Sequence, residues 1–238
     1  MVPISLRMKT IADMVPMGIS VADIGCDHGF VAIYMVQNRE APKAIAMDVN
    51  EGPLIRAKEH INQYGVESFI ETRLSDGAVK LEVGEVDAAI IAGMGGRLTI
   101  KILSVSLEKF IAMKAFVLSP HSDIPLVRDF LCKEGFEIDD EEFVYDEGKY
   151  YAVMRSHFTG LQQKISDLET EYGPILIKKK HPILKEYLVA EIQKINEIEG
   201  RLSKELESAS KEKTASIQKR IDEISSKVNG MEQILEGM

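Results

Sequence analysis

The stretch Val21-Ala-Asp-Ile-Gly-Cys-Asp-His-Gly29 decides the fold, because it joins an apolar strand to a glycine turn and then to a helical pattern. Its Asp23, Gly25 and Gly29 have the spacing D-x-G-x-x-x-G. Glycine lets the backbone of such a turn approach a ligand closely, and the following helix offers free N–H groups at its start. The stretch therefore predicts a ligand site at a strand end, with a tight packing turn as the alternative.

Short apolar runs alternate with amphipathic stretches on both sides of this turn. We expect strands at Val21–Ile24, Ala44–Asp48, Ser68–Arg73, Val86–Ala92 and Ala115–Ser119, with two more near Phe136–Tyr145 and Tyr150–His157. Helical patterns cover Ser5–Val15, which begins with a capping residue, and residues 29–38, 53–64, 96–110 and 123–134. Strands that alternate with helices predict a Rossmann-like α/β fold with a mostly parallel sheet. The short loop Asp146–Lys149 predicts an antiparallel hairpin for the last two strands.

Residues 161–238 have a different pattern. Apolar residues recur there at spacings of three and four, before and after a polar break near 208–214: Leu184, Leu188, Ile192, Ile195, Ile198, Leu202 and Leu206, then Ile217, Ile221, Ile224, Val228, Met231 and Leu235. Two such stripes predict an antiparallel helical hairpin of the coiled-coil type. We therefore predict two domains, an α/β domain at 1–160 and a helical domain at 161–238.

Composition excludes several classes of protein. The 238 residues suffice for about one or two domains, and 45% hydrophobic with 28% charged residues excludes a disordered chain. Two cysteines, Cys26 and Cys132, exclude a disulfide framework or a Cys-rich zinc site, and we expect no metal. No apolar run approaches the roughly 18 residues of a membrane span, and residues 1–15 lack the features of a secretory signal. We expect a cytoplasmic protein.

The charge is uneven along the chain. The formal net charge is −9, of which residues 161–238, with 13 Lys+Arg and 14 Asp+Glu, contribute only −1. The acidic first domain argues against non-specific nucleic-acid binding but leaves room for a local basic face. The absence of Trp and the 6% aromatic content argue against a stacking platform of the RRM type.

Three further strand ends carry groups that bind ligands. Asp48 ends the second predicted strand, where an acid can accept both hydroxyls of a ribose, and Asn50 is better placed to cap the next helix. Ser75-Asp76-Gly77 follows the third strand, where a carboxylate can accept from an adenine amine; a plain Asp-Gly turn is the alternative. Gly93-Met-Gly-Gly96 follows the fourth strand and lets backbone line a cleft, unless it is only a flexible loop.

The carboxyl ends of parallel strands converge on one crevice, so these turns should share a ligand. The phosphate fingerprint G-x-G-x-x-G is absent, which makes a nicotinamide oxidoreductase a weaker candidate. The residues expected to bind the cofactor are Asp23, Gly25, Cys26, Asp27, His28, Gly29, Asp48, Val49, Ser75, Asp76, Gly77, Gly93, Met94 and Gly95.

Together, these features over residues 1–160 resemble the class I S-adenosylmethionine-dependent methyltransferases. Four strings and the helical C-terminal part resemble more closely the bacterial tRNA (adenosine-22 N1)-methyltransferases: Ser5-Leu-Arg-Met8, Asp23–Gly29, Gly93–Gly96 and Glu171-Tyr-Gly-Pro174. The resemblance implies that S-adenosyl-L-methionine is the cofactor and that N1 of adenosine 22 in tRNA is methylated. It places Asp23, Gly25, Asp27 and Gly29 near the methionine moiety, Asp48 on the ribose and Asp76 on the adenine.

The chemistry of this reaction needs positioning more than a strong base. Adenine N1 has a lone pair and attacks the sulfonium methyl directly once the base has been taken out of the tRNA stack. Asp27 and His28 are the candidate catalytic residues, since a carboxylate favours a product that gains positive charge. The Gly93–Gly96 turn lacks the side-chain acceptor of an Asn/Asp-Pro-Pro-aromatic turn, which favours a ring nitrogen as the target.

Five basic side chains are candidate substrate contacts. Arg7 on the first helix is either such a contact or a surface charge, and we expect His121 to face the crevice. Ser119-Pro120-His121 stands where the family resemblance leads us to expect Gln-Pro-Asn, so no base-pocket role is carried over to that loop. Near the domain junction, Lys178, Lys179 and Lys180 either bind phosphate or form a solvated run.

Two alternatives to a tRNA enzyme and one question about assembly stay open at this point. A methyltransferase of small molecules or proteins would have a closed pocket with no basic rim, and a non-catalytic scaffold would have a broken cofactor site. The helical hairpin either clamps tRNA or dimerises, and we expect a monomer or a weak dimer.

Overall fold

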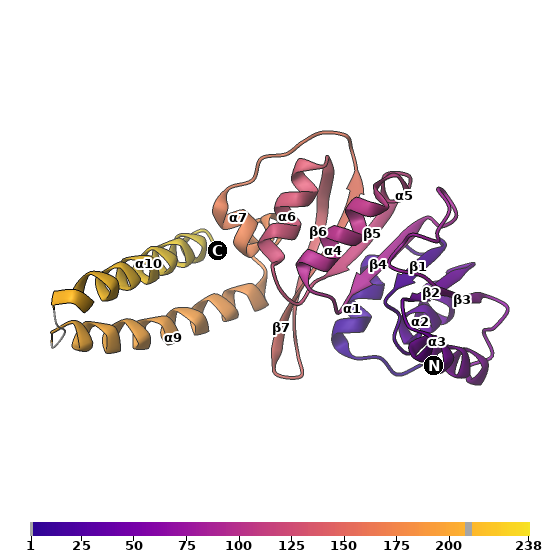
Figure 1. Ribbon diagram of the computed structural model, residues 1–238, viewed down its shortest axis with the longest axis horizontal. Coiled ribbons are helices and arrows are strands. Elements are labelled where there is room, and N and C mark those ends of the chain that lie inside the picture. Colours follow the sequence, from indigo (N-terminus) through magenta and orange to yellow (C-terminus); the bar gives the residue numbers. More distant parts are fainter. Residues whose placement is uncertain (1, 208–210) are drawn as a thin grey trace. The chain divides into compact units, whose positions relative to one another are not determined.

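The computed structural model describes residues 2–207 and 211–238 (Figure 1). Its contacts divide the chain into two compact units, Met1–Ile175 and Leu176–Met238. The predicted boundary, at residue 160, lies earlier in the chain.

The first unit is built on a seven-stranded sheet with the strand order β3-β2-β1-β4-β5-β7-β6. The strands are β1 (Val21–Ile24), β2 (Ala44–Asp48), β3 (Ile70–Leu74), β4 (Ala88–Ala92), β5 (Ala115–Ser119), β6 (Phe136–Asp146) and β7 (Lys149–Phe158). The first five strands pair in parallel, whereas β7 pairs antiparallel with both β5 and β6. This arrangement confirms the predicted Rossmann-like sheet and its antiparallel hairpin.

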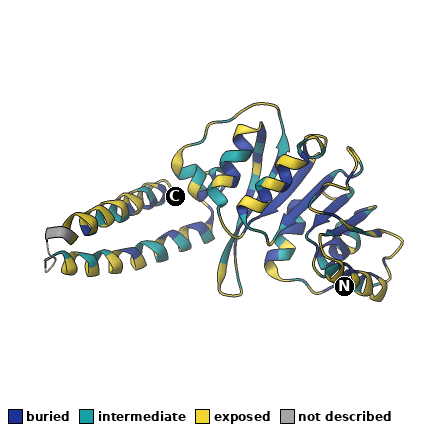
Figure 2. Cartoon of the chain, in the orientation of Figure 1, coloured by how far each residue is buried: buried dark blue, intermediate teal, exposed yellow. Residues whose placement is uncertain are grey.

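Helices cover both faces of the sheet. One face carries α1 (Leu6–Met14), α2 (Phe30–Asn38) and α3 (Glu51–Gln63), and the other carries α4 (Gly96–Val105), α5 (Leu107–Ile111) and α6 (Ile124–Lys133). In β2, Ala44 and Ala46 pack on the first face, and Ile45 and Met47 pack on the second. Because side chains alternate along a strand, burial on both faces explains the continuous apolar runs of the sequence. The central strands are dark blue in Figure 2 for this reason.

Several element ends differ from the sequence expectations. The strand expected from Val86 begins at Ala88, because its pairing with β1 starts at Val21 opposite Ala88. The strand expected from Ser68 likewise begins at Ile70, which pairs with the first residue of β2. The helix expected over 96–110 is broken at Ser106 into α4 and α5, and the second piece buries Phe110 completely.

Two local predictions about turns and caps are confirmed. Ser5 caps α1, since its side chain accepts a hydrogen bond from the Met8 N–H at 3.3 Å. Glu147 and Gly148 connect β6 to β7 with φ of 49° and 80°. Positive φ at both central residues is the signature of the two-residue turn that matches the twist of a hairpin.

A buried ion pair explains why the first unit extends beyond residue 160. The side chains of Arg128 on α6 and Glu141 on β6 are 2% and 0% exposed, and Nε donates to Oε1 at 2.9 Å. Arg128 Nη1 also donates to the carbonyls of Thr170 and Glu171 at 2.9 Å. Glu141 Oε2 accepts from the Ile175 N–H at 2.9 Å. The pair therefore fastens the segment around α7 (Asp167–Tyr172) to the sheet domain.

The second unit contains α9 (Pro182–Glu207) and α10 (Lys211–Glu236), and α8 (Pro174–Lys178) spans the boundary. The two long helices lie side by side (Figure 1), and Ser225 Oγ donates to Glu199 Oε1 at 2.9 Å across them. Their buried apolar side chains are Leu184, Leu188, Ile195, Ile217, Val228, Met231 and Ile234. The helical pair is thus confirmed, but Ile198 is 41% exposed and Ile234 is buried instead of Leu235. Residues 208–210 of the predicted break lie outside the described residues.

Within residues 2–207 and 211–238, no helix is long and apolar enough to cross a membrane. The same residues contain no group of three or more His, Cys, Asp or Glu side chains that could hold a metal ion.

Candidate active site

The turn between β1 and α2 is held in place by backbone hydrogen bonds. Gly25 N and Cys26 N both donate to the Met47 carbonyl, at 2.8 Å and 2.9 Å. Gly25 has φ of +81°, and a Cβ there would collide with Met94 Cε of the turn after β4. The positive φ favours glycine at this position, whereas the methyl group of Met94 ends a flexible side chain that can move aside. The contact brings two of the predicted strand-end turns together.

Asp23 is a buried carboxylate behind this turn. It is 5% exposed, its side chain accepts a hydrogen bond from the Ala32 backbone, and its Oδ2 has no partner among the described residues. Burial raises the pKa of Asp23 to about 7, and the nearby charge of Asp48 adds to the rise. An unpartnered buried carboxylate oxygen is costly, so this atom is suited to a ligand that brings a donor or a positive charge.

Asp48 is the last residue of β2 and pairs with Leu74, the last residue of β3. Its Oδ1 accepts from the Asn50 N–H at 2.9 Å, and its carbonyl accepts from the Ser75 N–H at 2.8 Å. Asn50 occupies the N-cap position of α3, as predicted, although its side chain makes no capping hydrogen bond. Val49, between them, is 59% exposed.

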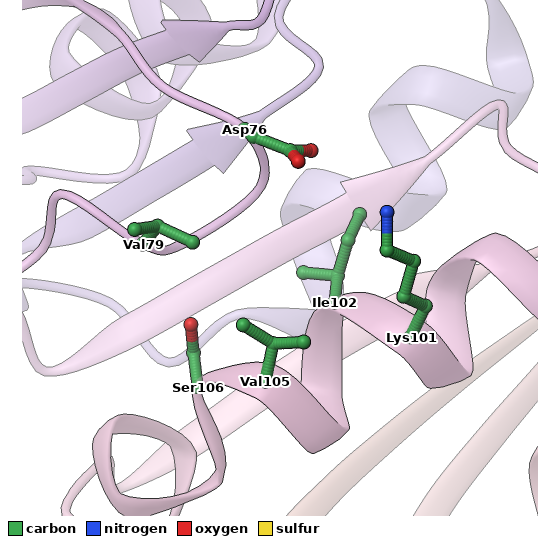
Figure 3. A pocket seen from close by; sticks show the side chains of 6 residues that line it. All are labelled: Asp76, Val79, Lys101, Ile102, Val105 and Ser106. Carbon is green, nitrogen blue, oxygen red and sulfur yellow. The ribbon is translucent and has the colours of Figure 1, made fainter.

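Asp76 is exposed in the turn after β3, beside a small cavity lined by Asp76, Val79, Lys101, Ile102, Val105 and Ser106 (Figure 3). The volume of the cavity is about 20 Å³, enough for about one water molecule. It is therefore not itself an adenine pocket, and a ligand would meet Asp76 from outside. Gly77, with φ of +59°, packs directly against Ile102.

The turn Gly93–Gly96 packs against the turn that follows β5. Gly93 N donates to the Ser119 carbonyl at 3.2 Å, His121 N to the Met94 carbonyl at 2.8 Å, and Gly96 N to the Ser122 carbonyl at 2.9 Å. His121 is exposed, and a Cβ at Gly93 would lie 3.7 Å from its Nε2. The backbone of His121 is thus held next to the glycine turn, and its role toward a substrate stays a prediction.

Arg7 is buried, at 7% exposure, so the alternative of a surface charge is wrong. Its Nη2 donates to the Ser119 carbonyl at 3.1 Å, and its backbone N–H donates to Asp146 Oδ2 at 3.1 Å. The guanidinium lies over the Tyr151 ring, 4.4 Å from its centroid. Arg7 therefore joins α1, the turn after β5 and the β6–β7 hairpin.

Asp27 and His28 contact α3. Asp27 Oδ1 pairs with Arg56 Nη2 at 3.1 Å, and the His28 carbonyl lies 2.9 Å from His60 Nδ1. The rings of His28 and Phe30 are stacked with centroids 5.7 Å apart. The His28 Nδ1 atom is buried without a partner among the described residues. His121, by contrast, contacts Gly93 and β7, so the two predicted groups lie on different elements.

Lys178, Lys179 and Lys180 are all exposed and belong to the second unit. The other predicted site residues belong to the first unit. The role of these lysines in binding phosphate stays a prediction.

Known proteins match this chain along most of its length. Residues 4–154 match the family model described as a methyltransferase domain. A tRNA (adenine(22)-N(1))-methyltransferase of Bacillus subtilis is 32% identical over 207 residues, covering 84% of this chain and 86% of that protein. The chain belongs to this methyltransferase family.

Two solved structures of tRNA methyltransferases agree with this methyltransferase in fold. The B. subtilis M1A22 enzyme TrmK has a TM-score of 0.82 at 29% identity and covers 99% of this chain and 100% of its own. TrmK of M. capricolum, in complex with S-adenosyl-homocysteine, has a TM-score of 0.75 at 25% identity. The match covers 96% of this chain and 99% of the M. capricolum chain.

S-adenosylmethionine is the cofactor of this methyltransferase. Its methionine end carries an ammonium group, which fits the buried, unpartnered Oδ2 of Asp23. The left-handed glycines beside it leave room for a ligand against the backbone. The residues present therefore fit the group.

Several residues that the sequence did not indicate contact the predicted site residues of this methyltransferase in the structure. Arg56 and His60 share one face of α3 beside Asp27 and His28, and their spacing of four residues was the available signal. The β6–β7 hairpin carries three more of these residues: Asp146, Lys149 and Tyr151. Only the pairing of strands distant in sequence brings them near Arg7 and His121.

Proposed function

We propose that this chain transfers a methyl group from S-adenosylmethionine to N1 of adenosine 22 in tRNA. The observation that carries the proposal is the meeting of the predicted strand-end turns at one edge of the sheet, in a chain 32% identical to a tRNA (adenine(22)-N(1))-methyltransferase. The glycines of the Gly93–Gly96 turn offer no side-chain acceptor, which suits a ring nitrogen as the target.

When bound, S-adenosylmethionine supplies an electrophilic methyl group on a sulfonium sulfur. The chain's own residues hold and orient: in this proposal Asp23 accepts the ammonium, Asp48 accepts the ribose hydroxyls and Asp76 accepts the adenine amine. The remaining expected cofactor contacts, from Cys26 to Gly95, act mainly through backbone that these turns expose. Because adenine N1 is unprotonated at neutral pH, no residue has to remove a proton, and alignment at near-attack distance supplies most of the rate.

Asp27 and His28 act at the methionine end in this proposal. The Asp27 carboxylate is already paired with Arg56, which weakens its field at a developing cation. His28 is oriented by its stacking on Phe30 and by the bond of its carbonyl with His60. We therefore expect Asp27→Asn to change the cofactor affinity more than the rate with saturating cofactor.

We infer further that the protein acts in the cytoplasm, where its tRNA substrate is, as a monomer or a weak dimer. The second unit is proposed to hold tRNA through its exposed Lys178, Lys179 and Lys180. Sedimentation at micromolar concentration tests the oligomeric state directly.

Methyl transfer from labelled S-adenosylmethionine to unmodified bulk tRNA, followed by nucleoside analysis, tests the proposed function. We expect labelled 1-methyladenosine, and we expect none with a tRNA transcript that carries guanosine at position 22. A protein that binds the cofactor in calorimetry but labels no tRNA would overturn the tRNA substrate.

A further inference from the structure

A cleft of about 390 Å³ opens between the turn after β5 and the β6–β7 hairpin. It is lined by Pro120, His121, Ile124, Lys149, Tyr150 and Tyr151. Its volume lies near the lower end of the range for small-molecule sites, about 300–1,000 Å³. None of its lining residues belongs to the cofactor-binding turns described above, so this cleft is available for a second ligand.

We propose that this cleft receives the target adenine, with His121 accepting a hydrogen bond from the exocyclic amine and Lys149 contacting a backbone phosphate. This assignment rests on the proposed function, because it presumes that a base is taken out of the tRNA stack. It adds the residues that position the base.

The position of His121 supports the assignment. Its backbone donates to the Met94 carbonyl, and its ring lies beside Gly93. Met94 in turn lies over Gly25 of the cofactor turn. A chain of direct contacts therefore leads from the cofactor turn through Met94 to His121. A base in this cleft would therefore lie next to the Gly93–Gly96 turn, which contacts the turn between β1 and α2.

The side chains that line the cleft contact further aromatic and charged groups. The Tyr151 ring carries the Arg7 guanidinium at 4.4 Å and lies 6.0 Å from the His121 ring, centroid to centroid. Tyr150 stacks on Phe143 with centroids 5.6 Å apart and an interplanar angle of 11°. Aromatic walls suit a flipped base, which loses its stacking in the tRNA and regains it in the pocket.

The reaction itself favours an acceptor at the exocyclic amine. The lone pair of N1 forms the new N–C bond while the C–S bond breaks and its electron pair goes to sulfur, so no proton leaves. The resulting 1-methyladenosine is a cation whose charge spreads onto the amine. The hydrogen bond from the amine to His121 therefore strengthens as the transition state forms, which is the condition for catalysis.

An acceptor role requires a neutral imidazole. Burial and the charges of Arg7 on α1 and Lys149 on β7 lower the pKa of His121, whereas the Gly93 backbone acts in the opposite direction. Tyr151, on the same strand as Lys149, also faces the ring. These surroundings favour the neutral form of the His121 imidazole. Lys149 is itself exposed at the mouth of the cleft, where a phosphate can reach it.

The test combines an enzyme variant with a substrate variant. We would measure single-turnover methylation by wild type and His121→Ala on tRNA transcripts with adenosine or with purine riboside, which lacks the amine, at position 22. We expect His121→Ala to lose about 10- to 100-fold in rate on adenosine, and the wild type to lose a similar factor on purine riboside. The double change should cost little more than either single change, because both remove the same hydrogen bond.

Matched variants separate this role from a general effect on the fold. His157→Ala replaces a histidine at the other end of β7 and should keep the wild-type rate on both transcripts. Lys149→Ala should raise KM for tRNA with little change in kcat. It should also reduce the slope of log affinity for tRNA against log salt concentration by about 1. Lys114→Ala, directly before β5, should change neither KM nor the salt dependence.

Each outcome distinguishes the two proposals. If the wild type forms no 1-methyladenosine, the proposed function fails. If the wild type is active and His121→Ala is equally active, or if the two losses multiply, the assignment of the cleft fails while the proposed function stands. Calorimetry with S-adenosylmethionine should give unchanged affinity for every variant, and a loss of affinity in His121→Ala would also overturn the assignment.

Discussion

The two sides of the sheet's carboxyl edge are built in different ways. The cofactor side comprises the turns that follow β1, β2 and β3. The hydrogen bonds of these short segments stay within one turn or reach the end of the neighbouring strand. The hairpin side, comprising the turn after β5 and strands β6 and β7, depends on residues far apart in the chain. Arg7 bonds Ser119 across 112 residues and Asp146 across 139 residues. The cofactor side is therefore recognisable from local motifs, and the hairpin side is not.

This comparison predicts that changes on one side leave the other largely intact. Damage on the hairpin side should reduce tRNA methylation or stability while cofactor affinity persists. Damage on the cofactor side should reduce cofactor affinity at nearly unchanged stability.

Ending the chain after Ile175 should abolish tRNA methylation and leave cofactor affinity within about two-fold, because the cofactor turns and their partners all lie earlier. Ending it after Gly160 should also destabilise the remaining protein, since Arg128 and Glu141 would lose their bonds to the segment around Thr170. Methylation assays, calorimetry and urea unfolding of both truncations check this. Full tRNA activity of the shorter or the longer truncation would defeat the proposed role of the second unit.

Arg128→Met should lower the free energy of unfolding by about 3–5 kcal/mol, because it leaves the Glu141 carboxylate buried without its counter-charge. Adding Glu141→Leu should recover much of the loss, since the double variant removes both charges. Urea unfolding monitored by circular dichroism gives the three values. Equal stability of Arg128→Met and wild type would show that the pair does not anchor this part of the fold.

Asp48→Ala should weaken S-adenosylmethionine binding by about 10- to 100-fold, because two ribose hydroxyls lose a charged acceptor worth about 1.5–3 kcal/mol. Stability should change little, since the only described partner of the carboxylate is the neighbouring Asn50 N–H. Calorimetry of the two proteins measures the affinity. An unchanged dissociation constant would remove Asp48 from the ribose role.

Asp23 should make both stability and cofactor binding depend on pH. Its pKa is raised from 3.8 to about 7 in the folded chain, so the folded state holds a proton that the unfolded state releases. The stability of the protein without cofactor should therefore fall as the pH rises from about 4 to about 7. At pH 6, binding of the cofactor ammonium should release up to one proton.

Calorimetry in two buffers of different ionisation enthalpy measures this proton, and Asp23→Asn serves as the comparison. The variant should release no proton and should show a flatter stability profile over the same range. Proton release that persists in Asp23→Asn would assign it to another group.

The elements that sequence reasoning located well are those fixed by short-range physics. The strands β1, β2 and β5 match the predicted bounds, because apolar runs buried on both faces end where glycine or a polar residue begins. The glycine turn was also predictable, since its D-x-G-x-x-x-G spacing reflects a conformational need at Gly25 itself.

What the sequence did not indicate depends on partners distant in the chain. The sequence allowed Arg7 to be either a substrate contact or a surface charge. Its burial depends on Ser119 and on Tyr151 of the hairpin, which lie far away in the chain. The burial of Arg128 had no local signal, because its partner Glu141 lies within a predicted strand rather than on the same helix. The break at Ser106 was missed because the apolar periodicity continues through it.

The burial of Arg7 also orders events during synthesis of the chain. Arg7 leaves the ribosome before the hairpin residues that cover it, Asp146 and Tyr151, because Asp146 follows it by 139 residues in the chain. Pairings that are distant in sequence form slowly, and chains with unpaired strand edges are prone to associate. Until the hairpin emerges, the nascent protein exposes the end of α1 and the edge of β5. The cofactor turns can therefore be complete in a chain whose cleft for the base does not yet exist.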